Sequence, residues 1–369
     1  MSKKELVFRR VLSGSLSAYF GHRGEIKKQK DTRRKNIANS VILTKEQKQQ
    51  INTFFKQHLG HKIGYQWHKL YTAISGSFDY RFFPEFFYSS DIQRLLNHPG
   101  YYIGLADKNI LPFILKGSHN EIKVPKTLCS CSNGIYLDIN SEATTLDKCV
   151  DLISKTKSFF IKPSIDSNSG IGCEIILVDK MNKDELKNVL TSHGKNFVVQ
   201  EPIIAQNDIS SLNPSSVNTF RVITYIIDGI VYTTPIIMRV GRDNSCCDNA
   251  HAGGLFVAVS NDGEIVSDGK TEFGGSFKCH PNTGITFKGY RLKNVEKVIC
   301  SAKKAALLMP HVGVIDWDFT IDVNGDPVLI EGNLFGGGVW LVQMAHGVGA
   351  FGDQTARILE IIRNNKTLY

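Results

Sequence analysis

The sequence lacks any long apolar run. No stretch of its 369 residues approaches the roughly 20 apolar residues that a transmembrane helix needs. The opening MSKKELVFRRVLSG is too charged, and too short in apolar core, to predict a secretory signal. We therefore expect a cytoplasmic protein, whose hydrophobic content of 42% can bury a large core divided among two or three lobes.

Cysteine occurs, but in no arrangement that predicts disulfides or zinc binding. Cys129 and Cys131, like Cys246 and Cys247, lie too close in sequence for ordinary bridges. No two CxxC motifs follow the spacing of a zinc site. We expect eight reduced thiols, most of them packing residues.

Acidic residues are scarce at the N-terminus. Residues 1–62 contain fifteen Lys or Arg and four Asp or Glu, so the excess behind the net charge of +9 belongs to this segment. Contact with the anionic inner face of a membrane, contact with an acidic glycan and simple solvation all fit such a segment, and solvation is the leading alternative. We expect no nucleic-acid partner, because no recognised binding motif accompanies the charge.

The pattern of apolar residues predicts a mixed α+β protein. A capping-type start at Thr44 precedes helical spacing, and an aromatic-rich helical stretch follows Pro84. Beyond Thr144 the order becomes helix, strand, glycine-rich loop, strand, helix, strand. The remainder is richer in strands, with a hairpin turn predicted at Asp228-Gly229.

A second hairpin carries the most informative residues. A two-residue loop at Asn324-Gly325 places Asp318 opposite Glu331 and Asp316 opposite Asn333, all on one face. Facing carboxylates repel each other unless a positive group lies between them. Hard oxygen ligands that leave positions open suit magnesium, which also holds substrate phosphates. A polar strand face bonded to Lys or Arg is the alternative.

A glycine- and serine-rich loop follows the strand that contains Lys162. Small residues at 167–172 let backbone amides close over phosphates, and the lysine supplies a positive charge. The loop is not a Walker loop, because GK[ST] is absent and a strand follows it. An ordinary loop is the alternative when this motif is taken alone.

The strand 197–200 stops at Pro202, a composition that suits a hinge between lobes. Backbone groups at 200–203 are placed to pair with an adenine edge, and Glu201 to accept from its amino group. Asp208 follows where a ribose hydroxyl would lie.

Arg221 and Arg239 are candidates for stabilising developing negative charge, because guanidinium groups match phosphate and carboxylate geometry. A two-residue turn at Asp228-Gly229 would place Asn218 opposite Arg239 and turn Arg221 to the other face. Both arginines can serve only if a bulge intervenes, and Pro235 is a plausible marker for one. A surface ion pair is the alternative for each arginine.

The order of these parts resembles the ATP-grasp superfamily, and more closely its sugar-transfer-associated group found with surface polysaccharide genes. The likeness covers the chain from about residue 80 to the C-terminus. The segments that carry it are ADKNILPFIL, FIKPSIDSNSGIG, VVQEPI, SVNTFRVITY, DNAHAGG, HPNTG and IDWDFTIDVNGDPVLIEGN.

The resemblance implies an α+β, ATP-grasp fold in which two mixed lobes close on ATP. We expect residues 1–104 to form a basic helical N-terminal region, 105–202 lobe A, and 203–369 lobe B with the metal site. The expected ATP-binding residues are Lys108, Lys162, Ser167, Asn168, Ser169, Gly170, Gly172, Gln200, Glu201, Pro202, Ile203 and Asp208.

The remaining expected roles divide among three groups. Arg221 and Arg239 are the catalytic candidates, and Asp318, Glu331 and Asn333 are the ligands of one or two Mg²⁺ ions. The expected substrate-binding residues are Asn218, Asn249, His251, Gly253 and Gly254. For His251 a structural role is equally favoured.

The chain departs from the family pattern at Asp316, where many relatives carry a glycine or a basic residue. This aspartate either adds a metal contact or alters how the acceptor is held.

The function implied is a magnesium-dependent ligase in capsule or O-antigen assembly. It would activate a carboxylate as an acyl phosphate for attack by an amine, with sugar- or amino-acid-derived substrates such as a uronic acid. An ATP-dependent sugar phosphotransferase and a non-catalytic ATP- or glycan-binding partner of a glycosyltransferase are the alternatives.

Overall fold

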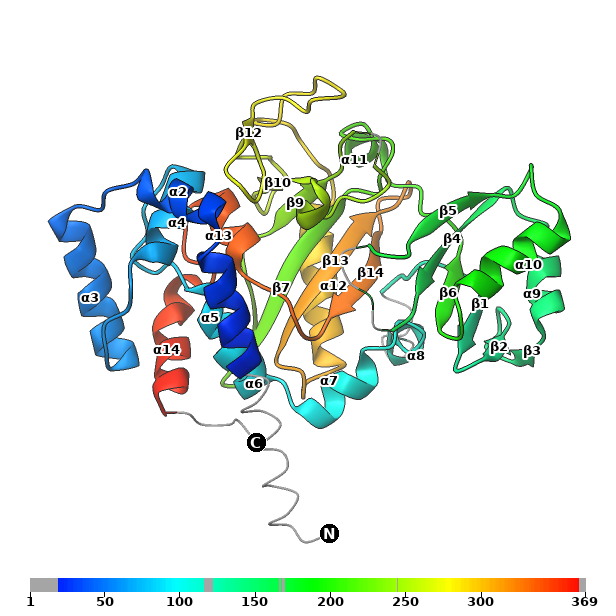
Figure 1. Ribbon diagram of the computed structural model, residues 1–369, viewed down its shortest axis with the longest axis horizontal. Helices are drawn as coiled ribbons and strands as arrows, with labels where there is room; N and C mark the ends of the chain where they lie inside the picture. Colours follow the sequence, from blue (N-terminus) through cyan, green and yellow to red (C-terminus); the bar gives the residue numbers. More distant parts are fainter. Residues whose placement is uncertain (1–18, 116–121, 166, 168–169, 244, 365–369) are drawn as a thin grey trace, which may run out of the picture.

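A computed structural model of the chain describes residues 19–115, 122–165, 167, 170–243 and 245–364. Three bodies lie along its long axis: a helical region, a central eight-stranded sheet and a six-stranded sheet (Figure 1). No helix in the described ranges combines the length and apolar character needed to cross a bilayer.

The described part of the helical region starts at residue 19. Its helix α3 starts with the predicted capping box at Thr44, and helical turns follow Pro84 as predicted. The elements are α2 (Thr32–Asn39), α3 (Lys45–Leu59), α4 (Gln66–Ser75), α5 (Glu85–Phe87), the π-helix η1 (Tyr88–Ile92), α6 (Gln93–Leu96), α7 (Pro99–Leu105) and α8 (Leu111–Leu115).

The six-stranded sheet has the strand order β3-β2-β1-β6-β4-β5 and is antiparallel throughout. It follows the predicted order of helix, strand, loop, strand, helix and strand. Its elements are β1 (Thr127–Ser132), β2 (Ile135–Leu137), β3 (Ala143–Thr144), α9 (Leu146–Ile153), β4 (Ser158–Pro163), β5 (Glu174–Leu177), α10 (Lys183–Ser192) and β6 (Phe197–Gln200).

The eight-stranded sheet has the order β12-β11-β10-β9-β7-β13-β14, with β8 paired to β7. Its strands are β7 (Thr219–Ile227), β8 (Ile230–Thr233), β9 (Ile237–Val240), β10 (Leu255–Ala258), β11 (Gly269–Lys270), β12 (Ser276–Phe277), β13 (Val314–Ile321) and β14 (Pro327–Asn333). The short helix α11 (Asn207–Ser210) precedes β7, and η3 (Ala250–Ala252) lies between β9 and β10.

The two faces of this sheet are covered differently. Phe220 and Val222 belong to the core under α12 (Val295–Leu307), whereas Ile223 and Tyr225 belong to the core shared with the helical region. The C-terminal helices α13 (Trp340–His346) and α14 (Thr355–Asn364) pack on α4 and α3. The helical region therefore covers one face of the eight-stranded sheet (Figure 1).

The β7–β8 turn and the bulge near Pro235 both follow the prediction. Ile227 pairs with Ile230 across Asp228-Gly229, whose φ values of 52° and 78° suit a two-residue hairpin loop. Beyond Pro235 the register shifts by one, so Arg239 lies opposite Thr219 and shares a face with Arg221. The bulge required for both arginines to serve one site is therefore present.

The β13–β14 hairpin corrects one prediction and confirms another. Its loop has three residues, because Asp322 N–H donates to Asp326 O at 2.9 Å and Gly325 takes a φ of 79°. The extra residue would shift the register, but a bulge at Ile330 restores it. The predicted pairing of Asp318 with Glu331 is therefore confirmed, although the predicted two-residue loop is wrong.

The cysteines only partly follow the prediction. Cys129, Cys131 and Cys149 are buried in the core of the six-stranded sheet. The other five are partly or fully exposed, so the expectation that most cysteines are packing residues is wrong.

Candidate active site

A cleft of about 370 Å³ lies between the six-stranded and eight-stranded sheets. It brings together most of the residues singled out in the sequence. Those that line it are Lys108, Lys162, Ser167, Gly170, Gln200, Glu201, Pro202, Ile203, Arg221, Arg239, Asn249, Asp318, Glu331 and Asn333.

Asp318 has polar contacts with three other side chains of the cleft. Arg221 donates to both of its oxygens, at 2.5 and 2.9 Å, and Nη2 of Arg239 lies 3.0 Å from Oδ2. Asn333 donates to the same Oδ2 at 3.3 Å. Guanidinium groups thus supply the positive charge that the facing carboxylates require, which is the alternative that the sequence left open.

Charge determines the ionisation of this cluster. Burial opposes ionisation of Asp318, but Arg221 and Arg239 outweigh it and hold the pKa of the carboxyl below its ordinary value. Burial likewise disfavours the charged form of Arg221, yet Asp318 raises the pKa of that guanidinium above its ordinary value. Both groups are therefore ionised at neutral pH.

Two lysines approach the hairpin from the opposite lobe. Lys162 on β4 is buried and donates to the carbonyl of the bulged Ile330 at 3.4 Å. Nζ of Lys108 lies 3.2 Å from Ser167 Oγ and 3.4 Å from Glu331 Oε1. Burial lowers the pKa of Lys162, an effect that the charge of Glu331 opposes. The two lysines therefore place positive charge beside β14, which contains Glu331.

The glycine-rich loop lies beside these lysines, since its Ser167 contacts Lys108. Gly170 and Gly172 have φ values of 77° and 73°, which favour glycine. A Cβ on Gly170 would lie 2.8 Å from Cys247 Sγ of the opposite lobe, so the loop packs closely across the cleft. Asn168 and Ser169, also expected to bind ATP, lie outside the described residues.

The segment after β6 presents backbone groups to the cleft. Glu201 N–H already donates to Lys126 O, and its carboxylate pairs with Lys126 Nζ at 2.7 Å. Pro202 has no N–H, whereas the amide of Ile203 bonds to none of the described residues. Ile203 N–H is thus a backbone donor of the cleft lining that is left available to a ligand.

Other predicted residues lie away from the cleft. Asp208 accepts from Lys293 N–H at 2.7 Å and fixes a loop. The buried Asn218 uses its side chain to bond Ser216, Gly241, Ile209 and Asn213.

His251, Gly253 and Gly254, which follow the cleft residue Asn249, also contact other parts of the protein and not the cleft. His251 Nδ1 lies 2.7 Å from Glu272 Oε2, and Gly253 ends η3 with a φ of 97°. A Cβ on Gly254 would meet Asp248 O at 2.3 Å, and one on Gly172 would meet Pro163. None of His251, Gly253, Gly254 and Gly172 is among the residues that line the cleft.

Sequence reasoning missed Asp248 and Thr219, which complete the cluster. Thr219 Oγ1 donates to Asp248 Oδ2 at 2.6 Å and accepts from Arg239 at 2.6 Å. Asp248 Oδ1 also lies 3.6 Å from Arg239 Nη2. The signal was available for Thr219, since it stands two residues before Arg221 on the same strand face.

Asp316 lies at the inner end of the cluster, where the helical region covers the strand. Tyr88 donates to its Oδ1 at 2.5 Å, and Gly338 N–H donates to its Oδ2 at 3.1 Å. Arg221 Nη1 reaches the same Oδ2 at 3.4 Å. Asp316 thus holds Arg221 and the loop after β14, and burial raises its pKa.

The oxygen donors of the hairpin fit magnesium in kind. Among the described residues Glu331 is contacted only at Oε1, and none donates to the side-chain Oδ1 of Asn333, so both side chains retain acceptors. Three donors surround Oδ2 of Asp318, whereas Oδ1 accepts from Arg221 alone among the described residues and so retains a lone pair. No three His, Cys, Asp or Glu side chains of the described ranges gather as a metal site.

Solved structures give distant likenesses. D-alanyl-alanine synthetase A from Vibrio cholerae O1 biovar eltor str. N16961 is 11% identical, with a TM-score of 0.43, over 72% of this chain and 66% of that one. The L-amino acid ligase from Bacillus licheniformis is 14% identical, with a TM-score of 0.40, over 71% of this chain and 48% of that one. The VanG D-Ala:D-Ser ligase from Enterococcus faecalis is 13% identical, with a TM-score of 0.40, over 70% of this chain and 61% of that one. The chain thus spans between about half and two thirds of the length of these proteins.

No curated protein matches the sequence. The sequence profile of the sugar-transfer associated ATP-grasp family, in contrast, matches residues 88–358, which include both sheets and every residue of the cleft. The α+β architecture and the ATP-grasp fold expected from the sequence are thereby confirmed, and the chain belongs to the sugar-transfer associated ATP-grasp family.

Proposed function

We propose that the protein is a magnesium-dependent ligase that uses ATP to join a carboxylate to an amine in surface polysaccharide assembly, such as capsule or O-antigen formation. The observation that supports this proposal is the cleft, in which two lysines from one lobe face two arginines and three oxygen-donor side chains from the other. Positioned charge of this kind is what phosphoryl and acyl transfer need.

The proposal assigns ATP to the side of the cleft formed by β4 and β6. Lys108, Lys162, Ser167 and the glycine loop would hold the phosphates, and Ile203 N–H would meet the adenine. Magnesium would be held by Glu331, Asn333 and Asp318, the last through Oδ1, and would neutralise phosphate charge.

In the proposed reaction an oxygen of the acid attacks the γ-phosphorus and ADP leaves. Nitrogen of the amine then attacks the acyl carbon, phosphate leaves and the amine loses a proton. Arg221 and Arg239 would bind the acid and the developing charge, because they lie beside one another at the centre of the cleft. A uronic acid that receives an amino acid or amino sugar is the substrate pair that we propose first.

We also propose that the chain divides into a basic helical region at 1–104, lobe A at 105–202 and lobe B at 203–369. Packing adds one detail to this division. His58 on α3 pairs with Glu360 on α14 at 2.9 Å, so the end of lobe B rests on the helical region.

A screen of ADP release over paired uronic acids and amines tests the proposal. We expect turnover that requires both substrates and magnesium, an amide in the product by mass spectrometry, and no turnover by Glu331→Gln. A stable phosphate ester without an amide would instead identify a sugar phosphotransferase. ATP binding without turnover on any pair would identify a binding partner and contradict the proposal.

A further inference from the structure

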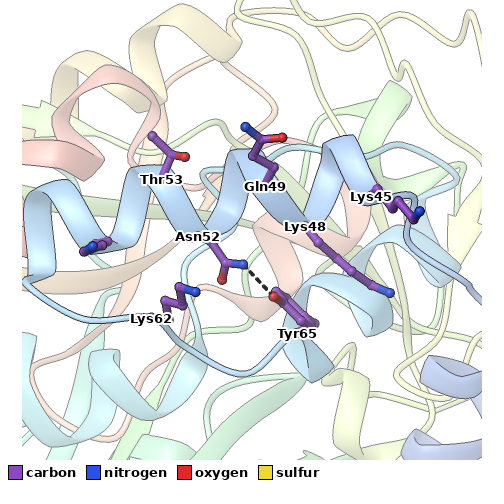
Figure 2. A pocket seen from close by; sticks show the side chains of 8 residues that line it. Lys45, Lys48, Gln49, Asn52, Thr53, Lys62 and Tyr65 are labelled. Atoms are coloured by element: carbon purple, nitrogen blue, oxygen red, sulfur yellow. Dashed lines mark hydrogen bonds between the residues drawn. The ribbon is translucent and has the colours of Figure 1, made fainter.

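A second hollow, of about 480 Å³, lies on the outer side of α3, at the opposite end of the molecule from lobe A (Figure 1, Figure 2). Its residues come from α3 and from the segment that connects α3 to α4. No acidic side chain lines it, whereas four lysines do: Lys45, Lys48, Lys56 and Lys62.

Helical spacing explains why the positive charges gather. Lys45, Lys48 and Lys56 share one side of α3, next to the face that buries Ile51 and Phe55. None of the four lysines has an ion pair with a described residue. Like charges three or four residues apart destabilise an isolated helix, so local stability does not account for the cluster.

Hydrogen-bonding groups lie between the lysines. Asn52 donates to the hydroxyl of Tyr65 at 2.8 Å, as Figure 2 shows, which leaves the Tyr65 O–H free to donate. The carbonyl oxygen of the Asn52 side chain is buried and accepts from none of the described residues. Gln49 and Thr53 extend this polar lining along the helix. An occupant of the hollow would therefore meet both donors and acceptors, as a polyhydroxylated ligand requires.

Other anionic occupants fit less well. A helix that lies on a bilayer inserts an apolar face, but the apolar face of α3 is buried in the protein, and Ile42 is the exposed apolar side chain that precedes it. Single-stranded nucleic acid binds by stacking on aromatic rings, whereas Tyr65 is half-buried with its hydroxyl bonded.

We infer that this hollow binds an acidic oligosaccharide, with the lysines at its carboxylates and Asn52, Tyr65, Gln49 and Thr53 at its hydroxyls. The site is separate from the cleft, and the inference does not rest on the proposed ligase reaction. It would hold a growing or finished acidic glycan on the protein while the cleft acts on small substrates.

Binding of hexagalacturonate, measured by calorimetry at low and high salt, tests this inference. We expect saturable binding that salt weakens, no binding of the neutral maltohexaose, and a loss of about tenfold or more in Lys48→Glu/Lys56→Glu. Lys56 is exposed, Lys48 is half-buried, and neither belongs to the hydrophobic core, so the melting temperature should change little.

Lys148→Glu/Lys180→Glu is the matched control, since it makes the same charge change at exposed positions of lobe A. An equal loss of affinity in this control would reduce the effect to overall charge and overturn the inference. Binding to phosphatidylglycerol vesicles or single-stranded DNA without hexagalacturonate binding would overturn it too. Mg·ATP affinity, followed in the same variants, should not change, so a failure here is separable from a failure of the proposed function.

Discussion

At the scale of single residues, the cleft is organised around Asp318. Its oxygens accept from Arg221, Arg239 and Asn333, and the arginines in turn contact Asp316, Thr219 and Asp248. Removing one member of such a network leaves a buried charge with fewer partners, which is costlier than loss of an exposed pair.

Arg239→Lys tests this network. Lysine keeps the charge, but a single ammonium group cannot bridge Thr219 and Asp318 as the guanidinium does. We expect kcat/KM for ADP release to fall by about 100-fold, which is on the order of 3 kcal/mol of transition-state stabilisation. Arg291→Lys, at an exposed pair with Asp262, is the control and should behave as wild type. An Arg239→Lys variant within twofold of wild type would exclude this role.

A buried histidine gives a pH prediction. Burial lowers the pKa of His68 to about 4, so the folded state binds its proton less tightly than the unfolded state, whose pKa is near 6.5. This contribution to stability is therefore present above pH 6.5 and is lost as the pH falls towards 4, by about 3 kcal/mol in all.

Denaturant unfolding of wild type and His68→Gln across this pH range checks that prediction. Glutamine can still donate to Tyr80 O, the bond that His68 Nε2 makes at 3.1 Å, but it does not titrate. The stability of the variant should thus depend less steeply on pH. Equal slopes for the two proteins would show that His68 is not responsible.

The residues of the cleft were predictable from the sequence to different degrees. Asp318 and Glu331 were placed together by strand periodicity, and Lys162 by the loop that follows it. Periodicity could not tell a metal from an arginine as the partner of Asp318, because Arg221 lies 97 residues earlier in the chain. The bond of His251 to Glu272 could not be predicted, because Glu272 lies outside the motif that contains His251.

At the scale of elements, bulges determine which side chains share a face. The shift at Pro235 brings Arg239 to the face of Arg221, and the bulge at Ile330 keeps Glu331 opposite Asp318. Pro235 is visible in the sequence as a residue that cannot donate to a sheet. The side chain of Ile330 gives no sign of a bulge in the sequence. The bulge could therefore not be predicted, although the pairing of Asp318 with Glu331 was.

The loop after β14 is a second element with a strict requirement. A Cβ on Gly338 would lie 2.1 Å from Glu85 Oε1, and Gly338 N–H bonds Asp316. We expect Gly338→Ala to lower the free energy of unfolding by about 1–3 kcal/mol, because the buried carboxylate must move. Gly104→Ala on α7, where nothing lies within 4 Å, is the control. Equal stabilities for these two variants in urea unfolding would contradict this view of the loop.

At the scale of the whole molecule, polar contacts join the two sides of the cleft. Lys108 reaches Glu331, and Lys162 reaches the carbonyl of Ile330. Overall, the α+β class, the motif order and the family could be read from the sequence. The layer of helices over the inner strand face could not, since it depends on contacts such as Tyr88 with Asp316, which are 228 residues apart.

The most direct test of the account is equilibrium dialysis of ATP with magnesium against wild type and Lys162→Met. Methionine keeps most of the buried stem of Lys162 but removes the charge that faces the cleft. The account predicts one ATP bound per chain by wild type, and affinity at least about tenfold weaker in the variant. Absence of ATP binding by the folded wild type, or equal affinity in both proteins, would contradict it.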